Sequence, residues 1–315
     1  MTNIDVLVSE VGPRDGLQSI DTIMSTEDKK RWIKAEAAAG VREIEVGSFV
    51  PAKLLPQMAD TGEIVRYAKT LPGLTVTALV PNFFGAKNAI EAGVDKMCLP
   101  LSVSETHSQS NLRKSHSEVL KEVENIVQYI NSLEEAKRPE FEGNLSTAFG
   151  CTMEGPVAEK TVLSLGVQLM ELGCDELGLS DTTGYANPAQ IKRLIRLVKN
   201  EVGEQHLTSI HLHNTRGLGL ANALAALEEG ITTLDSSLGG IGGCPFAPGA
   251  SGNIVTEDLV FMLDSMGLQT GIDLQALIEV NRMVKGSLPK EELYGFTVDS
   301  GLPKGYRNGG WGIAG

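Results

Sequence analysis

Residues 209–230 read SIHLHNTRGLGLANALAALEEG, and they hold one unit of the predicted fold. The run 207–213 around their start is rich in apolar and β-branched residues, which is typical of a strand. A helix-like stretch follows and ends in Glu-Glu-Gly, with glycine at the position where helices commonly stop. A strand that leads into a helix is the unit from which parallel sheets are built.

The same unit recurs along the chain. Amphipathic stretches separate the strand-like runs, and in 187–203 aliphatic residues recur at helical spacing with lysine and arginine on the other side. Eight such units predict a (β/α)8 TIM barrel of the α/β class. An open doubly wound sheet is the rival, but it usually carries a GxGxxG loop after its first strand, where this chain reads VGPRDGLQ. The predicted strands are 5–11, 42–49, 74–80, 95–101, 144–150, 176–182, 207–213 and 233–239.

The length of 315 residues predicts a single barrel domain over 1–315. From about residue 250 the pattern turns helical, with amphipathic stretches at 256–267 and 274–286 and a glycine-rich tail. We therefore expect the region 250–315 to form extra C-terminal helices and a tail appended to the barrel.

Composition limits the partners and the compartment. A net charge of −13 argues against nucleic acid, whose phosphates need clustered lysine and arginine. No apolar run is long enough to cross a membrane, and the N-terminus lacks a signal-peptide pattern. The four cysteines are widely spaced without a CxxC pair, which favours reduced thiols. We expect a cytoplasmic protein that binds neither nucleic acid nor membrane.

The His-Leu-His sequence of the seventh predicted strand points to a metal. In a TIM barrel, the chemistry lies at the C-terminal ends of the strands. Residues two apart on a strand face the same side, so His211 and His213 both face inward and Leu212 faces the helices. Asp15 after the first strand and Asn253 after the eighth add oxygen ligands. Two nitrogens and two oxygens suit Mg²⁺ or Mn²⁺ better than a closed tetrahedral zinc site.

Other polar residues also fall at predicted strand ends, and each has a purely structural interpretation. Arg14 can pair with its neighbour Asp15, and Glu45 can be a buried charge paired with an arginine. Asp181 can cap a helix, and Cys244 can be a small buried apolar residue. Gly-Gly pairs beside Cys244, however, favour a mobile lid over packing.

Five motifs together resemble the 3-hydroxy-3-methylglutaryl-CoA (HMG-CoA) lyases, a family of metal-dependent (β/α)8 enzymes. The resemblance covers nearly the whole chain in matching order, and the glycine–cysteine loop is its most specific part. It implies that the chain cleaves an acyl-CoA substrate, HMG-CoA, to acetyl-CoA and acetoacetate, and that it forms a homodimer. The motifs are EVGPRDGLQ (10–18), IEVGSFV (44–50), SDTTG (180–184), HLHNTRGLGLAN (211–222) and GGIGGCPFAPGASGNIVTEDLV (239–260).

The resemblance also implies a role for each motif residue. Arg14 stabilises the departing thioester enolate, and Cys244 lies on a loop that closes over the substrate. Because the enolate carbon needs a proton and a thiol on such a loop can donate one, we expect Cys244 to be the donor. The acceptor of the substrate's hydroxyl proton stays open between Asp181 and a group linked to a histidine. The implied metal ligands are Asp15, His211, His213 and Asn253. The other implied active-site residues are Glu45, Asp181 and Glu257, with Ser48 as a substrate contact.

One motif departs from the family pattern. Where lyases for HMG-CoA commonly read HxHDTYGQ, this chain reads HLHNTRGL, so Asn214 replaces an acidic residue and Arg216 an aromatic one. Arg216 brings a positive charge near the metal, where we expect it to bind a different acyl substituent or a second carboxylate. The same reaction on a related 3-hydroxyacyl-CoA, such as citramalyl-CoA, is the main alternative. A Claisen-type condensing enzyme and a non-catalytic metal-binding scaffold are further alternatives.

Overall fold

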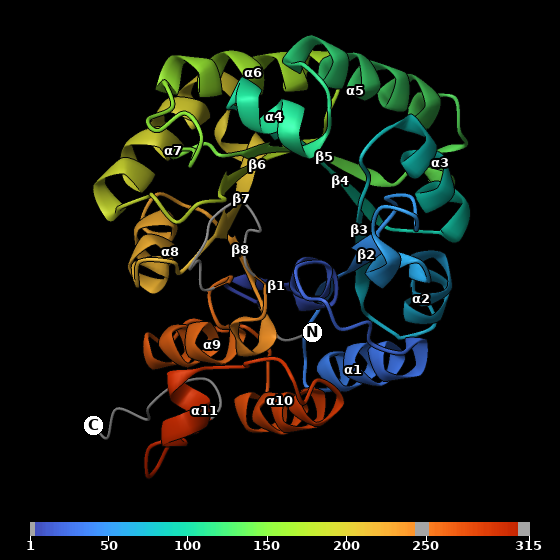
Figure 1. The fold of residues 1–315 in the computed structure, drawn as a ribbon. Coiled ribbons are helices and arrows are strands. Elements are labelled where there is room, and N and C mark those ends of the chain that lie inside the picture. Colours follow the sequence, from blue (N-terminus) through green and yellow to red (C-terminus); the bar gives the residue numbers. More distant parts are fainter. Residues whose placement is uncertain (1–3, 243–251, 308–315) are drawn as a thin grey trace.

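Eight parallel strands close into a barrel in the computed structural model, which describes residues 4–242 and 252–307 (Figure 1). Each strand pairs with its neighbours in chain order, and β1 pairs with β8 to close the ring, with Glu10 opposite Ser236. The predicted (β/α)8 barrel is therefore confirmed. The strands are β1 Leu7–Glu10, β2 Glu43–Ser48, β3 Thr75–Leu79, β4 Lys96–Ser102, β5 Glu140–Ser146, β6 Glu176–Asp181, β7 Leu207–Leu212 and β8 Thr233–Ser236.

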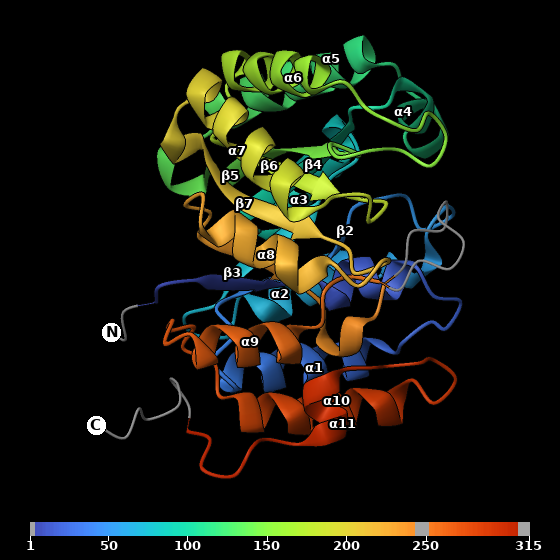
Figure 2. The same ribbon diagram turned by 90° about the vertical axis from the view of Figure 1, so that its left-hand side faces the viewer.

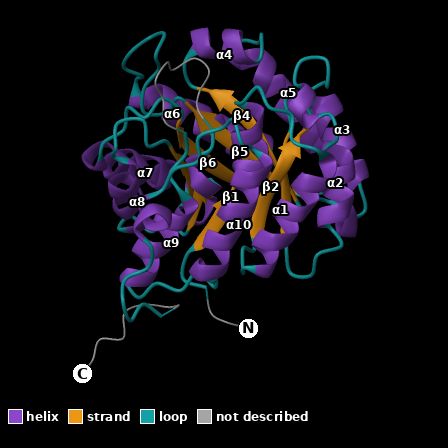
Figure 3. Cartoon of the chain, turned by 60° about the horizontal axis from the view of Figure 1, so that its bottom comes forward, coloured by secondary structure: helices purple, strands orange, loops and turns teal. Residues whose placement is uncertain are grey.

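Helices enclose the barrel on its outer side (Figure 3). The helix α7 shows why such segments fold this way: Asn187 accepts the N–H of Gln190 as an N-cap, and Pro188 fits the first helical turn. Its predicted aliphatic stripe is buried. The helices are α1 Thr26–Ala38, α2 Thr61–Ala68, α3 Phe83–Ala92, α4 Glu105–Asn111, α5 His116–Asn131, α6 Glu159–Leu172, α7 Pro188–Val202, α8 Gly219–Leu227, α9 Thr256–Ser265, α10 Leu274–Ser287 and α11 Phe296–Ser300.

The three C-terminal helices occupy different places. Because α9 is the first α-helix of the described chain after β8 and contacts β1, it takes the position of the eighth barrel helix. By contrast, α10 packs on α1 and α11 packs on α9, so both lie outside the β/α ring (Figure 2). None of the described helices has the length and apolar character that crossing a bilayer requires.

The fifth strand begins earlier than the sequence predicts. The expected range is 144–150, whereas β5 spans Glu140–Ser146. Its start is polar because Glu142 points into the barrel, where its Oε2 lies 2.8 Å from Nζ of Lys96 on β4. A charge pair inside the barrel departs from the apolar pattern that buried parallel strands usually show. Thr147, which falls in the predicted strand, has a positive φ of 57° in the turn after β5.

Polar side chains face the inside of the barrel, and apolar residues fill the layer between strands and helices. On β7, Leu212 is fully buried in that outer apolar layer, as its strand position predicts. Its neighbours His211 and His213 face the opposite way and line a cavity. The barrel therefore holds a polar space at its centre.

Candidate active site

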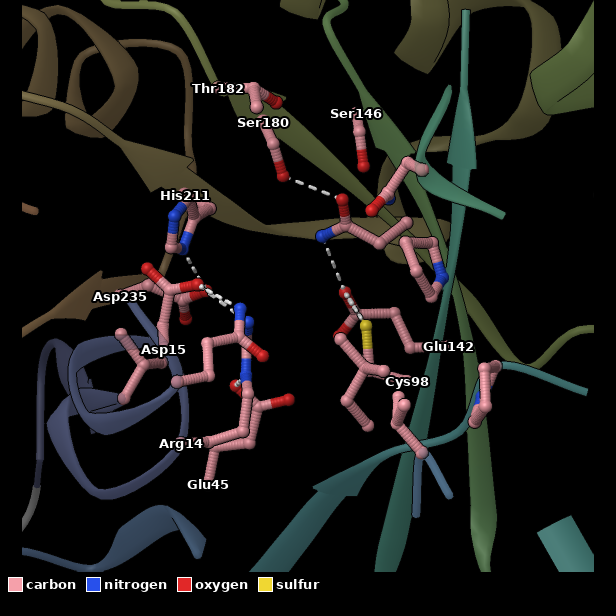
Figure 4. Close-up of a pocket in the computed structure, with 18 of the residues that line it drawn as sticks. Arg14, Asp15, Glu45, Cys98, Glu142, Ser146, Ser180, Thr182, His211 and Asp235 are labelled. Carbon is pink, nitrogen blue, oxygen red and sulfur yellow. Dashed lines mark hydrogen bonds and ion pairs between the residues drawn. The ribbon is translucent and has the colours of Figure 1, made fainter. Parts of the chain in front are cut away.

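A cavity of about 580 Å³ opens at the C-terminal ends of the strands and reaches down into the barrel (Figure 4). All eight strands contribute residues to its lining. Its deep part is polar and includes Glu45, Cys98 and Asn144, while its outer part is lined by apolar residues such as Pro51 and Leu54. The cavity can therefore hold a ligand with a polar reacting end and a longer, less polar arm.

The structure brings the four expected metal ligands together. One potential ligand atom from each of Asp15, His211 and His213 lies within 4.8 Å of the other two. The two Nε2 atoms of the histidines are 3.1 Å apart. Two ligands placed at right angles about 2.1 Å from an ion lie about 3 Å apart, so this spacing suits a shared cation. Asn253 joins the group because its Nδ2 donates to Oδ2 of Asp15 at 2.7 Å.

Two buried atoms of this group are unpartnered within the described part of the chain. Oδ1 of Asn253 accepts no hydrogen bond, and Nδ1 of His213 has no partner either. Because buried polar atoms are nearly always satisfied, an unpartnered amide oxygen beside a carboxylate and two imidazoles indicates a site for a ligand. The donor set of nitrogen and oxygen atoms fits a divalent cation.

The charge states of Asp15 and His213 favour metal binding, whereas for His211 contact with Asp235 outweighs burial and raises the pKa. Burial works against the charge of Asp15, but the nearby Arg14 and the two histidines outweigh it and hold the pKa of Asp15 well below its usual range. Burial and the neighbouring His211 lower the pKa of His213 to about 4. At neutral pH, Asp15 is therefore a carboxylate and His213 a neutral imidazole, which are the forms that bind cations.

Arg14 lies between a second carboxylate and the metal group, which we define as Asp15, His211, His213 and Asn253. Its Nη1 contacts Oδ1 of Asp15 at 2.6 Å, and its Nε contacts Oε2 of Glu45 at 2.5 Å. Burial raises the pKa of Glu45 to about 7, although the charge of Arg14 opposes this. Oε1 of Glu45 is buried and, among the described residues, has no hydrogen-bond partner. One oxygen of Glu45 is thus held by Arg14, and the other is free to exchange a proton.

Asp181, Glu257 and Ser48 are absent from the described residues that line the cavity. On β6, Ser180 faces the cavity, so the next residue, Asp181, faces the helices. Its Oδ1 accepts the N–H groups of Tyr185 at 2.8 Å and Ala186 at 3.2 Å, which lie in the loop before α7. The N-cap of α7 is Asn187, so Asp181 holds a loop and does not cap a helix.

Glu257 and Ser48 also bond to the protein rather than facing the cavity. Glu257 accepts from the N–H of Gly239 at 3.0 Å and from Nδ2 of Asn281 at 2.6 Å. Oγ of Ser48 accepts the N–H of Val50 at 3.4 Å. Both side chains support the backbone of loops around the site.

Arg216 is exposed and is absent from the described residues that line the cavity. Its Nη1 donates to the backbone oxygens of Thr183 at 3.1 Å and Gly184 at 3.0 Å. Its guanidinium group lies 4.5 Å from the centre of the Tyr185 ring. Arg216 therefore fastens the loop after β6. Cys244, the expected proton donor, lies outside the described residues.

Sequence reasoning missed several cavity residues, among them Asp235 and Cys98. Oδ2 of Asp235 on β8 is 3.0 Å from Nδ1 of His211, and Sγ of Cys98 on β4 is 3.8 Å from Oε1 of Glu142. Both residues lie within predicted strands, at inward-facing positions. Applying strand alternation to all eight strands, rather than collecting residues at strand ends, would have found them.

Glu10 joins the loops that carry the metal ligands. It is fully buried at the end of β1, and Oε1 accepts the N–H groups of Gly12 at 2.8 Å and Leu238 at 3.0 Å. Its Oε2 accepts the hydroxyl of Thr256 at 2.7 Å. Gly12 precedes Arg14 and Asp15, while Leu238 and Thr256 flank the segment that contains Asn253. One side chain therefore connects both sides of the metal group.

Comparison with known proteins identifies the family. The HMGL-like family model matches residues 5–284. The hydroxymethylglutaryl-CoA lyase of Bacillus subtilis is 41% identical over 288 residues, which are 90% of this chain and 94% of that protein. A Pseudomonas aeruginosa relative, named 3-hydroxy-3-isohexenylglutaryl-CoA/hydroxymethylglutaryl-CoA lyase, is 38% identical over 90% of this chain and 93% of its own.

A solved structure shows the same fold over almost the full length. The HMG-CoA lyase of Acinetobacter baumannii, in complex with coenzyme A and 3-methylmalate, matches with a TM-score of 0.89 at 39% identity. The match covers 98% of this chain and 99% of that one. These findings confirm the resemblance to HMG-CoA lyases. The chain therefore belongs to the HMGL-like family, and like its curated relatives it is a lyase.

Proposed function

We propose that this chain cleaves HMG-CoA to acetyl-CoA and acetoacetate with Mg²⁺ or Mn²⁺ as cofactor. The observation that carries the proposal is the position of Arg14, which contacts both Asp15 of the metal group and Glu45 in the polar part of one cavity. A permanent cation, a proton acceptor and a cation site are the parts that carbon–carbon cleavage next to a thioester needs.

The residues present fit the cation. Asp15, His211 and His213 would hold it, with the unpartnered Oδ1 of Asn253 as a fourth ligand. Nitrogen and oxygen donors of this kind would suit Mg²⁺ or Mn²⁺. Bound there, the cation would lower the pKa of the substrate's C3 hydroxyl and orient it.

Arg14 acts on the fragment that leaves. When the bond between C2 and C3 of the substrate breaks, its electron pair passes into the thioester enolate of the C2 fragment. The guanidinium of Arg14 stabilises that negative charge, and it cannot act as a base because it stays protonated. Glu45 and Asp15 hold it on two sides, so the group is already oriented before the substrate binds.

Glu45 is the residue that we assign as acceptor of the C3 hydroxyl proton. Its Oε1 is unpartnered, whereas the carboxylate of Asp181 is occupied by backbone N–H groups. Cys244 stays the proposed donor of the proton that converts the enolate carbon to the methyl group of acetyl-CoA. We propose that Asp181 and Glu257 support loops, and that contact of Ser48 or Arg216 with substrate requires those side chains to move.

The assignment of Glu45 predicts the pH dependence of the rate. A base must be deprotonated, and burial raises the pKa of Glu45 to about 7, so kcat/KM should fall about tenfold per pH unit on the acid side. A bound cation moves this acid limb of the pH profile to lower pH, because the cation stabilises the carboxylate of Glu45. Steady-state rates from pH 5.5 to 8.5 test this. In Glu45→Gln the residual rate should lose the limb, and an unchanged profile would exclude Glu45 as the base.

We expect the outer part of the cavity to bind the CoA part of the substrate. It runs past the loop after β2 to residues 110–114, which include Arg113 and Lys114. Nζ of Lys114 pairs with Glu122, which leaves Arg113 as the better partner for a phosphate. Lys53, a further basic residue nearby in sequence, is absent from the described lining.

Replacing Arg113 should therefore weaken CoA binding without changing the chemistry. We expect Arg113→Ala to raise KM about tenfold at low salt and to leave kcat within a factor of about two, since a rim charge contributes to binding in ground and transition states alike. Lys53→Ala is the matched control and should change neither constant. A loss confined to kcat in Arg113→Ala would contradict this role.

The substrate itself is tested by a product assay. Purified protein with Mg²⁺ is given HMG-CoA and, separately, citramalyl-CoA, and acetyl-CoA and the released keto acid are followed. Acetoacetate release at about 10⁴ M⁻¹s⁻¹ or more supports the proposal. Slow turnover of HMG-CoA beside fast release of pyruvate from citramalyl-CoA would identify citramalyl-CoA as the better substrate, with the same type of carbon–carbon cleavage. The polar deep cavity around Asn144 and Ser180 and the 3-methylmalate in the Acinetobacter relative motivate this second substrate.

Assembly and compartment stay predictions. We propose a cytoplasmic homodimer, and the three cysteines in the described residues, Cys98, Cys151 and Cys174, are free thiols, as a reducing compartment favours. Light scattering coupled to gel filtration should give twice the chain mass of 33.6 kDa. A mass of one chain at micromolar concentration would contradict the dimer.

A further inference from the structure

We propose that Asp235 positions His211 for the cation, by accepting the Nδ1–H of the ring and so directing Nε2 at the metal group. This inference rests on the proposed metal site. Asp235 would act through His211 and is therefore a positioning residue. Carboxylates commonly orient histidine ligands in this way, and they also increase the basicity of the ligand nitrogen.

The register of the barrel places the pair. His211 on β7 lies directly opposite Asp235 on β8, so both side chains face inward from adjacent strands. Oδ2 of Asp235 is 3.0 Å from Nδ1 of His211. A neutral imidazole carries one proton, so a proton donated from Nδ1 leaves the lone pair on Nε2. That Nε2 atom is the one 3.1 Å from Nε2 of His213.

The second histidine provides an internal contrast. Nδ1 of His213 has no hydrogen-bond partner among the described residues, and the backbone of His213 instead bridges to Asn253. Asn253 in the loop after β8 therefore positions the backbone of His213, whereas Asp235 on β8 positions the ring of His211. Asp235 also lies near Glu43 and Glu45 on β2, but among the described residues its side chain is hydrogen bonded only to His211. A role toward the histidine explains why a carboxylate stands at this inward position.

Metal binding without substrate tests the proposal. Mn²⁺ is titrated into the protein and free Mn²⁺ is followed by electron paramagnetic resonance. We expect Asp235→Ala to weaken Mn²⁺ binding about 10- to 100-fold, and Asp235→Asn, which keeps an acceptor oxygen, to lose less. Glu43→Gln is the matched control. It removes a carboxyl group from the same cavity, but that group is hydrogen bonded to Ser9 rather than to a histidine, so the affinity should stay near that of the wild type.

A second readout reports on the ring itself. The chain has five histidines, so ¹⁵N-histidine NMR can resolve the ring nitrogens of His211. The wild type should show a protonated Nδ1, and Asp235→Ala should show a mixture of tautomers while keeping the far-ultraviolet circular dichroism of the wild type. Equal Mn²⁺ affinity in Asp235→Ala and wild type would overturn the role of Asp235 alone. Failure of the wild type to bind Mn²⁺ would overturn the metal site, and this inference with it.

Discussion

Arg14→Ala should lower kcat about 10³-fold while the protein still binds Mn²⁺. Loss of a single group that stabilises a developing oxyanion typically costs about 10²- to 10³-fold, and Arg14 is a full charge that is buried in the cavity. Metal binding should survive, since removal of the guanidinium relieves repulsion between two neighbouring cations. Stopped assays for acetyl-CoA and Mn²⁺ titration measure the two properties separately.

Arg14→Lys tests whether a positive charge alone can replace the guanidinium group. Lysine keeps the positive charge but not the planar fork that contacts Asp15 and Glu45 together, so it should restore only part of the rate. Full activity in Arg14→Ala would remove Arg14 from the mechanism. Loss of Mn²⁺ binding in the same variant would show that Arg14 mainly organises the metal group.

Glu10→Ala should lower the free energy of unfolding by about 3–5 kcal/mol. The change leaves two buried backbone N–H groups without their acceptor, and each such loss costs about 1–3 kcal/mol. It also removes one of the two acceptors of the Thr256 hydroxyl, which keeps Oγ of Ser236. Activity should fall as well, because the freed loops carry Asp15 and Asn253. Urea unfolding followed by circular dichroism measures the first effect, and steady-state rates measure the second.

Glu10→Gln separates hydrogen bonding from charge. The amide keeps one acceptor oxygen for the two N–H groups, so we expect a loss of only about 1 kcal/mol. Burial raises the pKa of Glu10 to about 8, so this carboxyl group is largely neutral at pH 7 and a neutral amide resembles it. A urea midpoint for Glu10→Ala equal to that of the wild type would show that Glu10 does not hold the loops.

Strand alternation marks what the sequence can predict in this site. The pair His211 and His213 was predictable because both lie on one strand, and a period of two places them on one face. The same rule places Asp181 away from the cavity, since its neighbour Ser180 faces inward. Proximity to a strand end was the weaker signal, and it grouped Asp181 with residues that it does not touch.

Contacts between strands lie beyond such local patterns. The bond from Asp235 to His211 depends on the register of β7 against β8, and no period within either strand encodes it. The start of β5 was hidden for a related reason, because Glu142 is satisfied by Lys96 from another strand. Polar residues that look exposed in sequence become interior residues once a distant partner is present.

The pairing of β1 with β8, the first and last strands of the barrel, imposes an order on folding. Asp15 follows the first strand and Asn253 follows the last. Their side chains come into contact only when β1 pairs with β8, as the pairing of Ser9 with Asp235 shows. During synthesis of the chain, Asp15 is therefore made long before the other proposed metal ligands. Because a ligand that binds only the native state stabilises it by mass action, a divalent cation would act on ring closure and hardly at all on the earlier β/α units. Metal affinity would then report how completely the barrel has closed during folding.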